Sequence, residues 1–480
     1  MPLEIYDTLR RAQVPFEPRE DGRASIYVCG PTVQADAHIG HGRYAVVFDV
    51  LRRYLLWSGY DVLYVTNITD VDDKIIFRAD REDVSAPRIA ERYARAWNRT
   101  MDRLGVLPPD IQPRATGHIL EMQQLISTLI ERGKAYEADG NVLFRVRKFD
   151  EYGKLSNRSI EDMVQGDELV GAELKEDPLD FALWKAAKEG EPAWPSPWGP
   201  GRPGWHIECS VMASTHLGGG FDIHGGGLDL VFPHHENEIA QYEAVNDEPF
   251  ARYWMHNGMV QMGTEKMSKS IGNIVGLEEA IERWGRPALR MWYSQAAHRS
   301  PLTFDEERVA EAVAAVDRLA TFLRTVQFVV GDDEPATSEA AEPHRDAFVA
   351  AMDDDLNVPR ATAALHELVT EGHDRLGAAE RGDEAAIADV RALADLLREL
   401  ADDVLGLGLT DLLDESRDIG RHIGPLVEHL LEARAEARQE RDFASADAIR
   451  DRLAAAGVVI EDRPGGSRWY VEPGGWDSGA

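Results

Sequence analysis

The chain has 480 residues, more than one ordinary core can organise, and 44% of them are hydrophobic, so two to four folded domains are expected. Its 85 acidic residues outnumber 52 basic ones, and the net charge of −33 excludes general electrostatic attraction to nucleic acid. Only nine basic residues are lysines, which favours a salt-rich cytoplasm or, alternatively, an acidic protein from a GC-rich genome. Without a signal-peptide core or a membrane-length apolar run, a soluble, cytoplasmic protein is expected.

The first segment alternates between strand and helix. Ser25–Gly30 and Asp61–Ile68 are predicted strands, and apolar residues within Gly42–Trp57 recur at helical spacing. This order predicts a parallel βαβ unit and a doubly wound α/β domain. Further helices are predicted around Arg88–Met101 and over His118–Glu131.

The middle of the chain predicts an insertion into this domain. Gly190–Trp205 is dense in proline, glycine and tryptophan, as in an ordered loop that re-enters a domain. A second α/β stretch follows over residues 221–244. After residue 305 the pattern is helical and predicts a bundle, with a probable linker at Gly331–Pro343 and a helix-plus-hairpin unit over Leu426–Val471.

Two short motifs have the composition of phosphate-binding sites. His38-Ile39-Gly40-His41 follows a strand and opens a helix, where backbone N–H groups and the helix dipole attract anionic oxygens. In the string KMSKS, Lys266 and Lys269 lie three apart, and their ammonium groups could hold the charge on a departing pyrophosphate. The HIGH string alone could equally be purely structural, and KMSKS alone could be a solvated charged turn, but their combination in this order is specific.

With these two motifs the chain resembles the class I aminoacyl-tRNA synthetases. The resemblance implies a Rossmann-type catalytic domain that binds ATP, forms an aminoacyl-adenylate and passes the amino acid to the terminal adenosine of a tRNA.

A third feature is a set of possible metal ligands. Cys29 and Cys209 lie 180 residues apart, and a thiolate ligand or nucleophile is favoured over a disulfide in a reducing compartment. His234 and Glu238 are four residues apart, hence on one face of a predicted helix. Two thiolates, an imidazole and a carboxylate form a plausible zinc set, although His235 could equally be the ligand.

Longer strings narrow the resemblance to the cysteine-specific branch of that family. They include YVCGPTV, HIGHGR, YVTNITDVDDKII, GRPGWHIECS, DIHGGGLDL and FPHHENEIAQ. The resemblance implies L-cysteine, ATP and tRNA(Cys) as substrates, one zinc ion per subunit, and Mg²⁺ with ATP. It implies these site residues: Cys29, Cys209, His234 and Glu238 for zinc; Gly30, Thr69, Trp205 and His224 for cysteine; His38, Gly40, His41, Asp229, Lys266 and Lys269 for ATP, with His38, His41, Lys266 and Lys269 catalytic.

Zinc would also explain how such an enzyme rejects serine. An apolar pocket separates near-isosteres by only about 1–3 kcal/mol, whereas zinc binds a thiolate directly and an alcohol poorly. Four protein ligands, however, close a tetrahedral site, so either a fifth position or a weakly held Glu238 is needed for the substrate.

The C-terminal third resembles the helical-bundle and anticodon-reading parts of the same family. Arg441, Arg450, Arg463 and Trp469 are the expected tRNA contacts, although these arginines could equally pair with neighbouring acidic residues. We expect a monomer. The expected domains are a catalytic domain over 1–116 and 200–250, a connective insertion over 117–199, a stem-contact region over 251–305, a helical bundle over 306–412 and an anticodon-reading module over 425–473.

Two departures from the family pattern concern local contacts. Gln34 stands where the family usually has an aromatic residue, and the segment 166–177 looks shortened. Two rival functions also remain: a ligase that joins cysteine to an amino-sugar inositol in mycothiol synthesis, and a non-catalytic RNA-binding relative. The long C-terminal region argues against the first, and the intact motifs argue against the second.

Overall fold

The computed structural model describes residues 2–163, 172–263, 265–266, 275–331, 338–463 and 466–471. Residues 166–171, the first half of the shortened segment 166–177, and the KMSKS residues after Lys266 lie outside these ranges. The chain forms two compact units. The first contains Met1–Ala312, Pro343–Leu365 and Asp403–Gly406, and the second contains Val313–Glu342, His366–Asp402 and Leu407–Ala480.

A parallel sheet forms the centre of the first unit. Its strands are β3 (Arg23–Val28), β4 (Asp61–Thr66), β9 (Phe221–Gly227) and β10 (Ala251–Asn257), in the order β10-β9-β3-β4. Helix α1 (Ile39–Trp57) connects β3 to its parallel neighbour β4. The strands are rich in buried aliphatic and aromatic residues, as expected where both faces of a parallel sheet are covered. The predicted α/β fold is thus confirmed.

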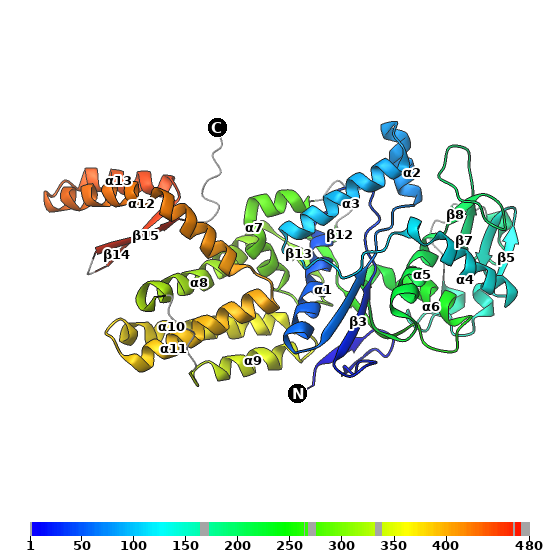
Figure 1. The fold of residues 1–480 in the computed structure, drawn as a ribbon, viewed down its shortest axis with the longest axis horizontal. Helices are drawn as coiled ribbons and strands as arrows, with labels where there is room; N and C mark the ends of the chain where they lie inside the picture. Colours follow the sequence, from blue (N-terminus) through cyan, green and yellow to red (C-terminus); the bar gives the residue numbers. More distant parts are fainter. Residues whose placement is uncertain are drawn as a thin grey trace. The chain divides into compact units, whose positions relative to one another are not determined.

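Helices α5 (Trp205–Leu217) and α6 (Glu236–Glu243) pack against each other in the same unit (Figure 1). Helix α2 (Asp73–Glu82) packs on α3 (Ala86–Arg103), and α7 (Leu277–Tyr293) packs on α1. Two small sheets complete the unit. One pairs β1 (Glu4–Asp7) with β2 (Ala12–Pro15), and the other contains β11 (Val260–Met262), β12 (Glu265–Lys266) and β13 (Leu302–Phe304).

An antiparallel sheet interrupts the parallel one between β4 and β9. Its strands are β5 (Ala135–Ala138), β6 (Asn141–Phe144), β7 (Phe181–Ala186) and β8 (Gly201–Pro203), in chain order. Helix α4 (Ile119–Glu131) packs against β5 (Figure 1). The proline-rich loop leads into β8 and then into α5, so it returns the chain to the unit that contains the parallel sheet. This is where sequence predicted an insertion.

The C-terminal part is helical and ends in a hairpin. Its helices are α8 (Glu306–Val330), α9 (Glu342–Met352), α10 (Val358–Ala379), α11 (Glu384–Arg398), α12 (Leu409–Gln439) and α13 (Phe443–Ala455). Strands β14 (Val458–Arg463) and β15 (Gly466–Val471) pair antiparallel and pack on α12 and α13. Both the bundle and the helix-plus-hairpin unit were predicted.

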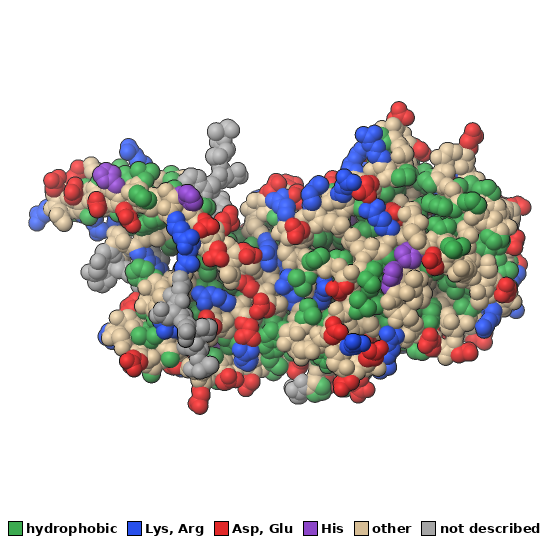
Figure 2. Space-filling model, in the orientation of Figure 1, with side chains coloured by type: hydrophobic (Ala, Val, Ile, Leu, Met, Phe, Trp, Pro, Cys, Tyr) green, Lys and Arg blue, Asp and Glu red, His purple; other side chains and the backbone are tan. Residues whose placement is uncertain are grey.

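The surface reflects the acidic composition. Acidic side chains are scattered over the face in Figure 2, while basic ones gather above α2 and α3. None of the helices in the described ranges combines the length and the apolar character needed to cross a membrane.

A buried ion pair joins α1 to α7. The guanidinium of Arg290, which is fully buried, donates to Asp49 Oδ2 at 2.6 Å, and Arg53 donates to the same oxygen at 2.8 Å. The backbone N–H of Leu107 donates to Asp49 Oδ1 at 2.8 Å. Burial alone would raise the pKa of Asp49, but Arg290 and Arg53 outweigh it and lower the pKa. The carboxylate is therefore required to neutralise Arg290 inside the unit.

Replacing Asp49 with Asn should destabilise the first unit by about 3–5 kcal/mol, because it leaves the buried Arg290 without its counter-charge. Urea unfolding of both proteins measures this. The difference in free energy of unfolding between the wild type and the variant should be largest at neutral pH. It should decline as pH falls through the lowered pKa of Asp49, because protonation removes the same negative charge. Asp61→Asn is the control, because it removes an exposed ion pair with Arg23. It should lower the free energy of unfolding by less than about 1 kcal/mol. A loss equally small for Asp49→Asn would contradict the assigned role.

Candidate active site

Four possible metal ligands from three parts of the fold meet at one place. Cys29 directly follows β3, Cys209 lies in α5, His234 lies in the turn before α6, and Glu238 lies in the first turn of α6. All four are buried, and one ligand atom from each lies within 4.8 Å of the others. Both cysteines are free thiols. The fold thus assembles the set predicted from sequence.

The Glu238 carboxylate lies at the centre of this set. Its Oε1 accepts from Cys29 Sγ at 3.4 Å and lies 3.1 Å from His234 Nε2. Burial raises the pKa of the Cys29 thiol, while its hydrogen bond to Cys209 lowers the pKa of Cys209, with a further contribution from His234. One thiolate is therefore favoured even before a cation binds.

These donors fit a metal ion. Two thiols, an imidazole and a carboxylate buried together are the ligand types that a zinc ion takes, and a cation would compensate the carboxylate and the thiolate. A second set shares Cys29 and Glu238 but replaces Cys209 and His234 with His224 and His235. The geometry therefore leaves open the choice between His234 and His235 that the sequence also left open.

Other histidines surround this cluster. Nδ1 of His206 lies 3.0 Å from Nδ1 of His234, and Nδ1 of His235 lies 2.8 Å from Nε2 of His256. Burial, followed by neighbouring imidazoles, lowers the pKa of His206 and His235, which keeps both rings neutral. Neutral imidazoles can orient a ligand ring without adding positive charge next to a metal.

The residues expected to bind cysteine lie beside the cluster. Asn67 Oδ1 accepts from the backbone N–H of Gly30 at 2.7 Å, and Asn67 Nδ2 donates to the Thr69 hydroxyl at 3.2 Å. That hydroxyl donates to Glu208 Oε2 at 3.0 Å. A Cβ on Gly30 would lie 1.7 Å from the Asn67 carbonyl oxygen, so only glycine fits there. Trp205 stacks on His234, with ring centroids 4.3 Å apart.

Glu208 is a buried acid that sequence analysis did not single out. Burial, with Cys209 next, raises its pKa well above the usual value. Asn67, His206 and Tyr44 were also missed by sequence analysis. His206 lies within the string GRPGWHIECS, and Tyr44 directly follows HIGHGR. Tyr44 donates to the carbonyl oxygen of Cys29 at 2.6 Å. No spacing rule indicates such contacts, because they depend on how α1, α5 and β4 pack.

The HIGH residues open α1, as predicted. His38 Nδ1 accepts from the N–H of Gly40, and His41 Nδ1 accepts from the N–H of His38, both at 3.2 Å. The two rings stack, with centroids 3.8 Å apart, and His41 meets the edge of Trp97. The histidines therefore cap the helix reciprocally, and both are held at the helix N-terminus where an anion is attracted.

The remaining nucleotide-site residues are only partly described. Asp229 is exposed in the turn after β9. The backbone of Lys266 lies in β12, paired with Gln261 of β11. Lys269 lies outside the described residues.

In the second unit, Arg441 and Arg450 are exposed, as expected for residues that bind a partner. Trp469 is half-buried and packs on the small core of Val427, Leu453 and Val458. The backbone of Arg463 lies in β14. Two further arginines, Arg434 and Arg438, instead pair with Asp462, at 2.8 and 3.0 Å.

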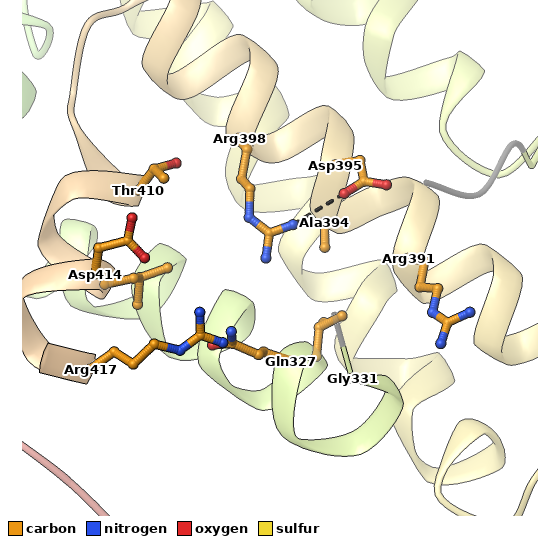
Figure 3. A pocket seen from close by; sticks show the side chains of 11 residues that line it. Gln327, Gly331, Arg391, Ala394, Asp395, Arg398, Thr410, Asp414 and Arg417 are labelled. Atoms are coloured by element: carbon orange, nitrogen blue, oxygen red, sulfur yellow. Dashed lines mark hydrogen bonds and ion pairs between the residues drawn. The ribbon is translucent and has the colours of Figure 1, made fainter. Parts of the chain in front are cut away.

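A polar pocket of about 220 Å³ lies among α8, α11 and α12 of the second unit (Figure 3). Arg398 pairs with Asp395 at 3.1 Å, and Arg391 donates to the carbonyl oxygen of Val330. Arg417, Asp414 and Thr410 face the same space from α12. The expected site residues do not line this pocket.

Comparisons with known proteins agree with the geometry. The family model of the tRNA synthetases class I (C) catalytic domain matches residues 15–314, a DALR domain matches 347–410, and a cysteinyl-tRNA ligase anticodon binding domain matches 422–469. A cysteine–tRNA ligase of Streptomyces avermitilis is 48% identical over 98% of this chain and 100% of its own length. One of Thioalkalivibrio sulfidiphilus is 48% identical over 97% of this chain and 99% of its own. Methionyl-tRNA synthetase of Mycobacterium tuberculosis, solved with methionyl-adenylate, shares the fold, with a TM-score of 0.64 at 15% identity over 82% of this chain and 93% of its own.

Cys209→Ser should remove tightly bound zinc, because an alcohol is a poor zinc ligand at neutral pH. The zinc content, measured by elemental analysis after dialysis, should fall from about one ion per chain in the wild type to a small fraction of that in the variant. Ser210→Ala, on the same helix, removes a hydrogen bond to Gln241 and should retain the metal. Retention of zinc by Cys209→Ser, with its loss from His235→Ala, would instead assign the metal to the second donor set.

Proposed function

Since the chain belongs to the cysteine–tRNA ligases of the class I tRNA synthetases, we propose that it activates L-cysteine with ATP and transfers it to the terminal adenosine of tRNA(Cys). The observation that carries this proposal is the buried set of Cys29, Cys209, His234 and Glu238, which is linked to the HIGH helix by the hydrogen bond from Tyr44 to the Cys29 carbonyl oxygen. A thiol-binding centre beside a phosphate-binding motif matches the two substrates of cysteine activation.

The four donors would hold one zinc ion. When bound, this ion would favour the thiolate of cysteine over the alcohol of serine. The Trp205 ring covers His234, and both are held by the packing of α5 on α6. The chain's own contribution is to fix these donors in a buried place, so that selectivity does not depend on pocket size.

Thr69 would orient the amino acid. Its hydroxyl proton is donated to Glu208, so the oxygen offers an acceptor to the substrate ammonium group. Asn67 fixes Gly30 and Thr69 at the same time. The side chain of the substrate would then point to the zinc donors and its carboxylate to the ATP.

ATP would bind with Mg²⁺ across the HIGH motif and the KMSKS lysines. His38, Gly40 and His41 lie at the positive end of α1, which favours the phosphates, and Asp229 is proposed to bind the ribose. The carboxylate of cysteine attacks the α-phosphorus and pyrophosphate leaves. Lys266 and Lys269 would stabilise the charge that develops on that leaving group.

The tRNA would be bound mainly by local arginines, since the net charge of the protein opposes it. Arg441, Arg450 and Arg463 of the C-terminal module are the proposed contacts, with Trp469 packed behind the hairpin. The arginines around the pocket in Figure 3 offer further phosphate contacts in the same unit. A ligase acting on an amino-sugar inositol would have no use for this module.

Lys269→Ala should reduce cysteine-dependent ATP–pyrophosphate exchange by about 100-fold or more, because it removes charge stabilisation from the transition state. Circular dichroism should show an unchanged fold. Lys188→Ala, an exposed lysine in the connective insertion, is the control and should exchange normally. Near-normal exchange by Lys269→Ala would refute the assigned role.

Replacing Arg441 and Arg450 together with Gln should weaken tRNA(Cys) binding about tenfold and lower the salt dependence of binding, because fewer counterions are released. Filter binding at several salt concentrations measures both. ATP–pyrophosphate exchange should stay at the wild-type rate, because it does not involve tRNA. Replacing Arg421, which is paired with Asp418, is the matched control. If the double variant and the control bind tRNA(Cys) equally well, Arg441 and Arg450 do not contact the tRNA.

A further inference from the structure

The metal site has an unsolved geometric problem. Four protein ligands would complete a tetrahedron, so a substrate thiolate would need a fifth position, and a carboxylate that bound through both of its oxygens would fill that position instead. Something must therefore restrict how Glu238 binds. The two oxygens of Glu238 already have different partners in the structure.

Oε1 faces the proposed ligands, with Cys29 Sγ at 3.4 Å and His234 Nε2 at 3.1 Å. The other oxygen of Glu238, Oε2, lies 2.8 Å from Nε2 of His224. Both His224 and Glu238 are fully buried, so no exposed partner competes for this contact. Because a metal-binding carboxylate is ionised and only accepts hydrogen bonds, Nε2 of His224 must carry the proton.

The His224 ring has little freedom to turn away. It lies on β9, directly opposite Trp254 of β10 and Tyr27 of β3 in the parallel register. Its ring stacks on Trp254 with centroids 4.5 Å apart and an angle of 16°, and it meets the edge of Tyr27 at 5.4 Å. Two neighbouring strands therefore fix the direction of the N–H that holds Oε2.

We propose that His224 is a positioning residue that binds Glu238 Oε2, so that Glu238 would offer only Oε1 to the metal and its second oxygen would not take the fifth position, which the cysteine thiolate needs. This proposal rests on the proposed function. It also explains the overlap of the two donor sets: His224 lies within reach of the metal site because it binds the ligand carboxylate. Replacing an outer partner of this kind typically lowers metal affinity or activity by about 10–100-fold.

The test uses the full-length protein loaded with Co²⁺, whose visible absorption responds to coordination number, without ATP or tRNA. His224→Leu removes the donor with little change in volume, and His224→Gln keeps an N–H donor at similar reach. His298→Leu is the matched control, because the Nε2 of this buried histidine lies 3.7 Å from the carboxylate of Asp355 and faces neither Glu238 nor a possible metal ligand. Cysteine and serine are titrated into each protein. Thermal unfolding checks the fold, and His224→Asn, whose amide is too short, replaces the leucine variant if that variant does not fold.

We expect every variant to bind one equivalent of Co²⁺. Cysteine should change the spectrum of the wild type, His224→Gln and His298→Leu, while His224→Leu should bind cysteine about 10–100-fold more weakly. Loss of Co²⁺ from both His224→Leu and His224→Gln would make His224 a ligand and overturn the proposal. So would wild-type cysteine binding by His224→Leu, or equal losses in the leucine and glutamine variants. If cysteine leaves even the wild-type spectrum unchanged, the proposed function itself fails.

Discussion

The carboxylate of Glu238 is the group on which the site depends. It is fully buried and has neighbours from β3, β9 and the turn before α6, namely Cys29, His224 and His234. A carboxylate in such a place is costly unless several donors or a cation compensate its charge. The elements that surround it are therefore placed by an electrostatic requirement as well as by hydrophobic packing.

The parallel sheet meets this requirement through its topology. The carboxyl ends of β3, β4 and β9 lie at one edge, so Cys29, Asn67 and His224 come together although the insertion separates β4 from β9. The insertion leads through β8 directly into α5, which carries Trp205, Glu208 and Cys209. The proposed amino-acid site and the proposed metal site thus depend on the same register of strands. The HIGH helix begins in the connection between two of those strands, which brings the nucleotide motif to the same edge.

Charge is distributed to suit two different tasks. Inside the first unit, individual arginines such as Arg290 are matched to single carboxylates. On the surface, an acidic excess opposes general RNA binding, and the proposed tRNA contacts are therefore arginines at particular places. In the hairpin module, Asp462 occupies Arg434 and Arg438, whereas Arg441 and Arg450 are exposed. The association of the acidic composition with a salt-rich cytoplasm stays a prediction.

The sequence by itself determined the α/β class, the insertion, the helical C-terminal region and the identity of Cys29, Cys209, His234 and Glu238 as candidate ligands. The spacing of apolar residues indicates which positions are buried, and long motif strings indicate the family, so both can be found without coordinates. Only the tertiary structure decided that Glu238 is shared with His224, that Asn67 links Gly30 to Thr69, and that Glu208 is buried beside them. These contacts join residues from 2 to 139 positions apart, and their distances depend on strand register and helix packing, which no local pattern encodes.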